Sequence, residues 1–366
     1  MRNASIFAAA PLGFSALLAC ALLALPASAA RGAEPDPFRL RLSVQAGYDD
    51  NILQLSEDEL REFEEDPDPD QFLIESTDDV ITRARAELRW ETNLWKERRT
   101  YWSARITAYI YATNDVKDYE EYLVGVDQEI HRPSRHRSWV ELEYTRTPSR
   151  YSREITDDDA ALAAGTRIRE SLIQETDEYW LSYRQRILGR ALELEGGYRL
   201  EVMEYGTHFP ERDAVRSTWV LQGRSEPLET WPFQFTISEE FGTNDAEGNL
   251  ASTTFEDDDP SYTFYTTTIQ AEFPWSGGHF EAEIEIEYRN YTTDNPLDTV
   301  RFDREDDRRT YTGRVEQTLS PGLLSFAEYR RRDVDADLPR EAAATDEDTD
   351  YVEDLVLLGI RWELSF

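Results

Sequence analysis

The chain has 366 residues and is poor in several residue types, and each shortage argues against a class of protein. With one cysteine it can form neither a disulfide framework nor a metal site built from several thiolates. Its 39 Lys and Arg residues face 75 Asp and Glu residues, and a net charge of -36 repels phosphate, which argues against nucleic acid as a partner. After residue 30 no run approaches the roughly 20 apolar residues that a membrane-spanning helix requires.

Aromatic residues are plentiful, with 9 Trp, 19 Tyr and 16 Phe. Disordered chains of high net charge are poor in aromatic residues. The composition therefore predicts a folded protein in spite of its charge.

The N-terminus has the layout of a secretory signal peptide. Arg2 precedes an apolar run over residues 6–25, and residues 26–30 read Pro-Ala-Ser-Ala-Ala, a site of the kind that signal peptidase accepts. Cys20 resembles the cysteine of a lipoprotein box, but the apolar run continues past it, whereas a lipidated cysteine should begin a polar chain. We predict a cleaved signal peptide over residues 1–29, which removes Cys20, and a single mature domain over residues 30–366.

Apolar and polar residues alternate along the whole mature chain, most strictly from Phe280 to Tyr288, where every second residue is glutamate. Such alternation places one residue set on each face of a β-strand. Fourteen segments show it: 38–48, 82–94, 102–112, 122–130, 139–144, 179–187, 192–202, 215–223, 233–239, 262–273, 280–288, 310–317, 323–329 and 352–366. The pattern predicts an all-β protein.

The connections between these segments alternate in length. Long ones cover 53–77, 149–176, 243–260, 292–307 and 335–350, and short ones include 96–99, 189–190 and 320–322. Short turns on one rim, long loops on the other and an even strand count are typical of a transmembrane up-and-down antiparallel β-barrel with both termini in the periplasm.

The shortest turn, Gly189-Arg190, predicts the register of its hairpin. Ile187 would face Leu192 on the outer surface, while Arg186 faces Glu193 and Arg184 faces Glu195 on the inner one. A slip by one residue would place the arginines in lipid.

A soluble β-sandwich also has alternating strands, but two features favour the membrane barrel. Polar faces carry charges of both signs, as in Arg83, Arg85 and Glu87 on one strand, and these can pair across a wet, closed interior. Aromatic residues collect at strand ends, as bilayer interfaces require. They are Phe38, Trp95, Trp231, Trp275, Phe280 and Phe366 near the short turns, and Tyr48, Tyr144, Tyr179, Tyr262 and Tyr288 near the long loops.

Two motifs resemble known outer-membrane proteins. Trp362, Leu364 and the terminal Phe366 at alternate positions resemble the signal by which Gram-negative outer-membrane barrels are recognised for assembly, which implies the barrel assembly machinery as a partner. The first strand ends in Gly47-Tyr48-Asp49-Asp50-Asn51, similar to the opening of barrels associated with exopolysaccharide export loci or with surface lipoprotein assembly. Unlike the lipoprotein assembly modulators, this chain shows no helical repeats ahead of the barrel.

The inner face is the first candidate for function. Its predicted charge ladder comprises Glu281, Glu283, Glu285, Glu287, Glu193, Glu195, Arg184, Arg186, Arg83 and Arg85. An acidic lumen attracts cations and repels anions. The alternative is that the carboxylates only neutralise the arginines.

The long loops offer two further candidates. Residues 157–159 are acidic and can cap a short helix over 160–164, so segment 149–176 could plug the lumen or could be an ordinary external loop. Acidic clusters within residues 62–70, 257–259, 303–307 and 346–350 could bind divalent cations or simply keep the loops soluble. We predict no resident metal site and no cofactor.

No sequence motif of a hydrolase or of a phosphate-binding loop occurs, so we do not expect an enzyme. The sequence predicts a porin-like outer-membrane barrel, in contact with lipid and lipopolysaccharide, that passes small or chain-like solutes through an acidic, cation-preferring lumen. The alternatives are an accessory barrel of polysaccharide or protein export, and a structural surface protein without transport activity.

Overall fold

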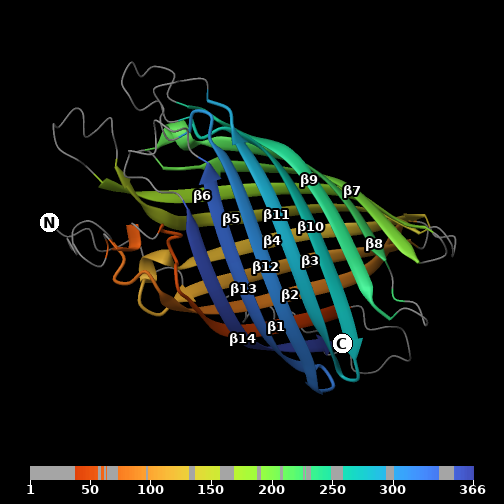
Figure 1. Cartoon of the computed structure of the whole chain (residues 1–366). Coiled ribbons are helices and arrows are strands. Elements are labelled where there is room, and N and C mark those ends of the chain that lie inside the picture. The colour runs from red at the N-terminus through yellow and green to blue at the C-terminus, as the bar shows by residue number, and fades with distance from the viewer. Residues whose placement is uncertain are drawn as a thin grey trace.

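The computed structural model describes residues 38–56, 59–61, 63, 73–95, 98–131, 137–156, 169–187, 191–206, 209–225, 227, 232–248, 259–293, 301–337 and 350–366. These residues form one closed barrel of fourteen antiparallel strands in up-and-down order (Figure 1). The predicted signal peptide, the turn at 189–190 and most of the acidic loop residues lie outside the described residues.

All fourteen predicted strands are confirmed. They are β1 (Phe38–Asp49), β2 (Asp79–Trp95), β3 (Arg98–Tyr111), β4 (Tyr119–His131), β5 (Ser138–Thr156), β6 (Arg169–Ile187), β7 (Leu192–Glu204), β8 (Ala214–Ser225), β9 (Gln234–Ala246), β10 (Tyr262–Trp275), β11 (Gly278–Tyr291), β12 (Glu305–Ser320), β13 (Leu323–Asp337) and β14 (Tyr351–Ser365).

Two short 3₁₀ helices, η1 (Asp115–Lys117) and η3 (Pro210–Arg212), follow β3 and β7. No helix in the described part of the chain is long and apolar enough to cross a membrane.

The first and last strands close the barrel. β1 pairs with β14 over its whole length, from Arg39 opposite Ser365 to Asp49 opposite Leu355. Phe38 and Phe366 exchange backbone hydrogen bonds of 3.3 and 3.2 Å, so the C-terminus lies on the rim of the short turns (Figure 1). Closure leaves no sheet edge to be satisfied by lipid.

The two faces of the sheet differ as predicted for a membrane barrel. Large apolar side chains are exposed on the outer surface, among them Leu358 at 62%, Leu221 at 59% and Trp219 at 55%. The alternate positions, which carry most of the arginines and glutamates, face the interior. This distribution is the reverse of a soluble sandwich, in which the exposed face is polar.

The hairpin of β6 and β7 has the predicted register. Ile187 lies opposite Leu192, Arg186 opposite Glu193 and Arg184 opposite Glu195. The pairing keeps Arg184, Arg186, Glu193 and Glu195 on the inner face.

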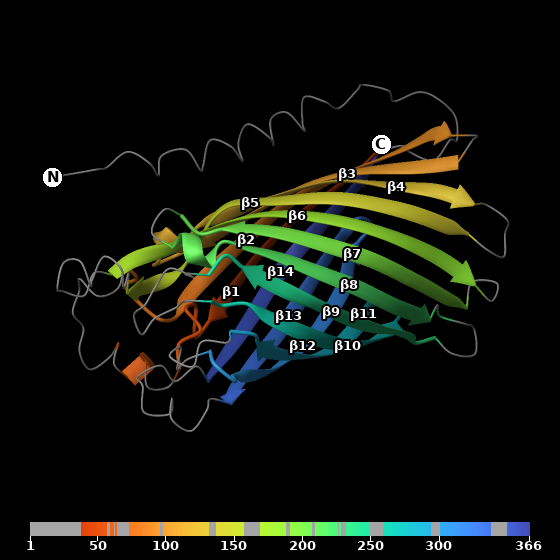
Figure 2. The ribbon, with the colours of Figure 1, turned by 90° about the horizontal axis from the view of Figure 1, so that it is seen from above.

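The bounds predicted for the long loop 149–176 are wrong, because both of its ends are strand, and the plug predicted for its central part lies outside the described residues. Residues 149–156 extend β5 and residues 169–176 extend β6, and Figure 2 shows the two strands running side by side. The register shifts between Thr147 and Arg150 and again between Tyr151 and Glu154. Each bulge interrupts the two-residue period and so hides the strand from a pattern search. The proposed helix over 160–164 lies outside the described residues.

Two smaller predictions are also wrong. β12 begins at Glu305, so the acidic residues 305–307 belong to a strand and not to a loop. Tyr262 lies on the lumen side, where its ring contacts Tyr291 and the Arg289 guanidinium, and not in the outer aromatic belt. Near the rim both faces of a strand meet water or lipid headgroups, so polarity there no longer identifies the inner face.

Candidate functional site in the lumen

The predicted charge ladder lies on the inner wall, but its members differ in how they are compensated. Arg186 pairs with Glu193 through its Nε at 2.8 Å. Arg184 turns to Asp127 of β4 at 2.8 Å, and only its Nε comes within 3.8 Å of Glu193. Glu195, although opposite Arg184 in the sheet, makes no hydrogen bond or ion pair with any described residue.

The four glutamates of β11 are likewise unequal. Glu281 accepts a hydrogen bond of 2.7 Å from the Gln270 amide, and Glu287 is the centre of an arginine network. Glu283 and Glu285, between them, have no hydrogen-bond or ion-pair partner in the described part of the chain. Neutralisation by arginine therefore accounts for part of the ladder. Glu283 and Glu285 form no ion pair with a described residue, although Arg332 and Arg216 lie near enough to Glu285 to act on its charge.

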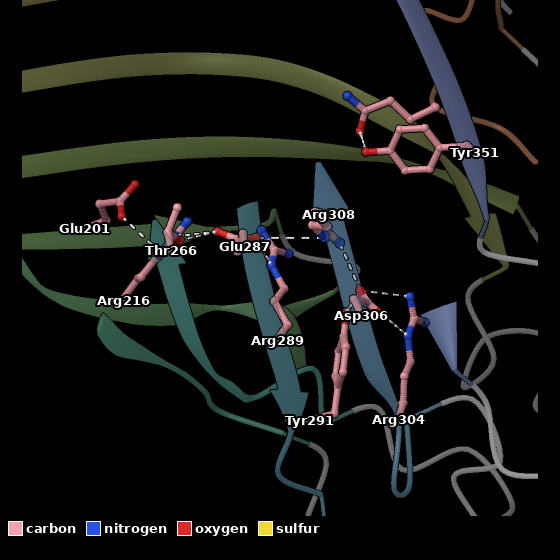
Figure 3. A network of polar contacts seen from close by, with 11 residues as sticks. Glu201, Arg216, Thr266, Glu287, Arg289, Tyr291, Arg304, Asp306, Arg308 and Tyr351 are labelled. Atoms are coloured by element: carbon pink, nitrogen blue, oxygen red, sulfur yellow. Dashed lines mark hydrogen bonds and ion pairs between the residues drawn. The ribbon is translucent and has the colours of Figure 1, made fainter. Parts of the chain in front are cut away.

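The network of ion pairs around Glu287 joins three strands, β8, β11 and β12, near the long-loop rim (Figure 3). Glu287 accepts a hydrogen bond from Arg289 on its own strand and forms ion pairs with Arg216 of β8 at 3.5 Å and with Arg308 of β12 at 3.9 Å. Each arginine is less than a quarter exposed, so little solvent screens these pairs.

Asp306 continues the network along β12. Its side chain is fully buried, with Arg304 at 2.6 Å and Arg308 at 3.1 Å. Of the acidic residues predicted at 303–307, this one is a buried structural partner of two guanidinium groups.

Arg83 and Arg85 of β2 form no ion pair with the glutamates of the predicted charge ladder. Arg83 donates to the Gln45 side chain at 2.9 Å and lies 5.9 Å from the Tyr109 ring. Arg85 has no hydrogen-bond or ion-pair partner among the described residues, and its Nε is buried. The wall formed by β2 is therefore basic, whereas β11 is acidic.

The first long loop, after β1, forms an apolar cluster that sequence reasoning missed. Ile52, Leu53, Leu55 and Ile74 are buried together with Tyr151 of β5. The Tyr111 ring packs against this cluster and also against a second one, whose buried members are Ile81 of β2 and Leu355 and Leu357 of β14. The latter three occupy inward positions of their strands, so the loop rests on the lumen wall at the outer mouth. We call residues 51–56 and 73–78 the docked loop.

The pentapeptide Gly47–Asn51 anchors this loop to the last strand. A Cβ on Gly47 would lie 2.1 Å from the Val356 carbonyl oxygen, so only glycine permits the close approach of β1 and β14. The Asp50 carboxylate accepts from the Asp354 amide at 2.7 Å. The motif that resembles export-associated barrels thus has a structural role within this barrel.

Asn51 fixes the start of the docked loop. Its side chain is 2% exposed and makes three hydrogen bonds: Nδ2 donates to the carbonyls of Leu55 at 2.7 Å and Val352 at 3.0 Å, and Oδ1 accepts from the Leu55 amide at 2.9 Å. One buried amide therefore satisfies two loop groups and one group of β14.

Lys117 of η1 holds the loop from the other side. Its buried Nζ donates to the Ile52 carbonyl at 2.7 Å and to the Ser152 carbonyl at 3.4 Å. Burial lowers the pKa of Lys117 to about 8, and the nearby Arg150 guanidinium lowers it further. The charges of Asp49 and Glu353 act in the opposite direction.

Asn114 and Asp79 fix the end of the docked loop. The Asn114 Oδ1 accepts from the backbone amide of Glu75 at 2.7 Å, and Asn114 Nδ2 donates to Asp79 at 2.8 Å. The loop is therefore attached at both of its ends. Apolar residues within an acidic loop were the available sequence signal, but the pattern does not identify the strands against which they pack.

Other predicted site residues are placed as follows. Trp362 and Leu364 are each 46% exposed on the outer face of β14, and the Phe366 ring stacks on Phe38 at 6.5 Å. Among the described residues no group of three or more His, Cys, Asp or Glu side chains is arranged to hold a metal ion.

Comparison with protein-family models and with curated proteins finds no match. Solved outer-membrane proteins match over most of the chain. A loop L8 deletion mutant of OmpT from Vibrio cholerae has a TM-score of 0.46 at 9% identity, covering 90% of this chain and 100% of that chain. The anion-selective porin of Comamonas acidovorans has 0.41 at 7%, covering 89% and 98%. OprD of Pseudomonas aeruginosa has 0.38 at 10%, covering 91% and 97%. Similarity at this level carries no information on transport or selectivity.

Proposed function

We propose that the protein is a cation-preferring channel of the outer membrane for small or chain-like solutes, with an outer mouth narrowed by the docked loop. Support comes from the apolar exterior and the charged interior of a closed barrel. The observation that carries the cation preference is the pair Glu283 and Glu285, which face the lumen without a described cationic partner. Uncompensated carboxylates raise the local concentration of cations.

The test is ion selectivity of the refolded mature chain in a planar bilayer under a salt gradient. We expect a cation-selective reversal potential, and we expect the Glu283→Gln and Glu285→Gln double variant to move that potential toward zero. Glu120→Gln is the matched control, because Glu120 lies on the outer face of β4, where the Tyr122 hydroxyl donates to it. A parent channel without cation preference, or a double variant that matches the control, would refute the proposal.

Targeting and partners form part of the same proposal. Residues 1–29 would direct export and be removed, and Trp362, Leu364 and Phe366 would be read by the barrel assembly machinery. Lipid and lipopolysaccharide would contact the outer face, and divalent cations could gather at the acidic loops.

A barrel that refolds but conducts no ions would instead favour the alternatives, an accessory role in polysaccharide or protein export or a structural role. The docked loop is the observation that favours them, because it occupies part of the outer mouth. Recording a variant in which this loop is released, as described in the Discussion, separates a restricted channel from a closed barrel.

A further inference from the structure

A second group of uncompensated carboxylates lies on the wall formed by β5, β6 and β7. Glu141 and Glu143 occupy consecutive inward positions of β5, and Glu195 faces the lumen from β7. None of the three makes a hydrogen bond or ion pair with a described residue. The neighbouring Glu193 and Asp127 take up the available guanidinium groups of this wall.

Electrostatics links these carboxylates into one group. Glu141 lies among the carboxylates of Glu143, Asp127 and Glu195 and near the Arg184 guanidinium, and Glu143 lies near Arg105. Arg184 is already engaged with Asp127 at 2.8 Å. The wall therefore has an excess of negative charge that no described residue balances.

A buried hydroxyl without a partner lies in the middle of this group. Ser182 is 2% exposed, and its Oγ has no hydrogen-bond partner among the described residues. In the sheet it lies between Glu141 on β5 and Gly197 on β7, on the lumen side. A buried hydroxyl of this kind calls for a partner that the protein itself does not supply.

An aromatic ring completes the wall. Trp180 lies opposite Glu143 and is half-buried. A Cβ on Gly197 would come within 2.1 Å of the Trp180 ring, so the ring can lie against β7 because this residue is glycine. The Arg199 guanidinium lies over this ring, 5.5 Å from its centre, so a cation of the protein itself already contacts the ring. The Trp180 ring can still pack on the methylene groups between the charges of an organic cation.

We infer that the lumen wall of Glu141, Glu143, Glu195, Ser182 and Trp180 binds linear polyamines. Carboxylates two residues apart on one strand are about 6.7 Å apart at their Cα atoms. Ammonium groups separated by three or four methylenes are about 5 to 6 Å apart, so successive charges of a polyamine match Glu141 and Glu143. The inference rests on the proposed cation-preferring channel and names the class of organic cation that it holds.

The experiment measures spermidine binding to the refolded mature chain in detergent by calorimetry, and spermidine block of the current in a bilayer. We expect the Glu141→Gln and Glu143→Gln double variant to weaken binding about tenfold and either single variant about threefold, and Ser182→Ala to weaken it as well. The outer-face variant Glu120→Gln should bind spermidine as the parent does.

The outcomes separate this site from the channel proposal. Unchanged affinity in the double variant, or an equal loss in Glu120→Gln, overturns the site even where the bilayer shows cation selectivity. Binding that depends on Glu141 and Glu143 supports the site even in a barrel that conducts no ions, because calorimetry does not require an open pore. Folding of each variant is checked by the heat-modifiable shift of the barrel on a gel.

Discussion

Replacing Asn51 by alanine should release the docked loop while the barrel stays intact. The side chain makes three hydrogen bonds, and its loss leaves the Leu55 amide, the Leu55 carbonyl and the Val352 carbonyl without that partner. Each buried polar group left unpaired costs about 1 to 3 kcal/mol. If one of the three groups bonds to water instead, the two that remain unpaired weaken docking by about 3 kcal/mol. The ratio of docked to released protein should then fall about a hundredfold.

The assay is limited proteolysis of the barrel in liposomes, with single-channel recording in parallel. Release exposes residues 51–56 and 73–78 to protease and widens the outer mouth, so cleavage within the docked loop should accelerate and conductance should rise. Asn93→Ala is the matched control, since Asn93 is an exposed asparagine at the far end of β2. If Asn51→Ala is cleaved no faster than this control and conducts no better, the loop is not held by the contacts described.

Three further predictions follow from other contacts. Burial lowers the pKa of Lys117 from 10.5 to about 8, so between these pH values the docked state binds fewer protons than the released state. Docking should therefore strengthen by up to about 3 kcal/mol as pH rises from 8 to 10.5, and its free energy should stay constant below pH 8. Openings to higher conductance should become rarer over that pH range, and Lys117→Met should abolish the dependence on pH. Gly47→Ala should prevent closure of β1 on β14 and abolish the heat-modifiable folded form, whereas Gly196→Ala, whose Cβ has 3.7 Å to its nearest neighbour, should fold normally. Asp306→Asn should lower the urea midpoint by the equivalent of about 3 kcal/mol, because Arg304 and Arg308 lose the carboxylate that compensates them, and an unchanged midpoint would show that these charges are solvated.

The strands could be predicted because side chains along a barrel strand point alternately to the outer and the inner face, so apolar and polar residues alternate in the sequence. The segment Phe280 to Tyr288 and the hairpin register from Ile187 to Leu192 are the clearest cases. Strand prediction failed where this alternation is interrupted. Bulges in β5 shift the alternation, and the start of β12 is polar on both faces because it lies at the rim.

The charged residues that line the lumen could be predicted from the sequence, but their ion pairs could not. Sequence places Glu195 opposite Arg184, yet the guanidinium reaches Asp127 on β4, two strands from β6, because long side chains converge inside a barrel. The docked loop shows the same limit. Its apolar residues are visible in the sequence, but Tyr151 and Lys117, which receive them, are about 65 to 100 residues away along the chain.

The anchoring of Asp50 and Asn51 on β14 has a consequence for assembly. The first loop to be synthesised depends for its position on the last strand, since the groups it binds belong to Val352 and Asp354. While β14 is still unpaired, the loop lacks that anchor and the mouth has its full width. Closure of the barrel wall and anchoring of the docked loop therefore depend on the same strand, so the entrance is narrowed only in a barrel whose wall is already closed.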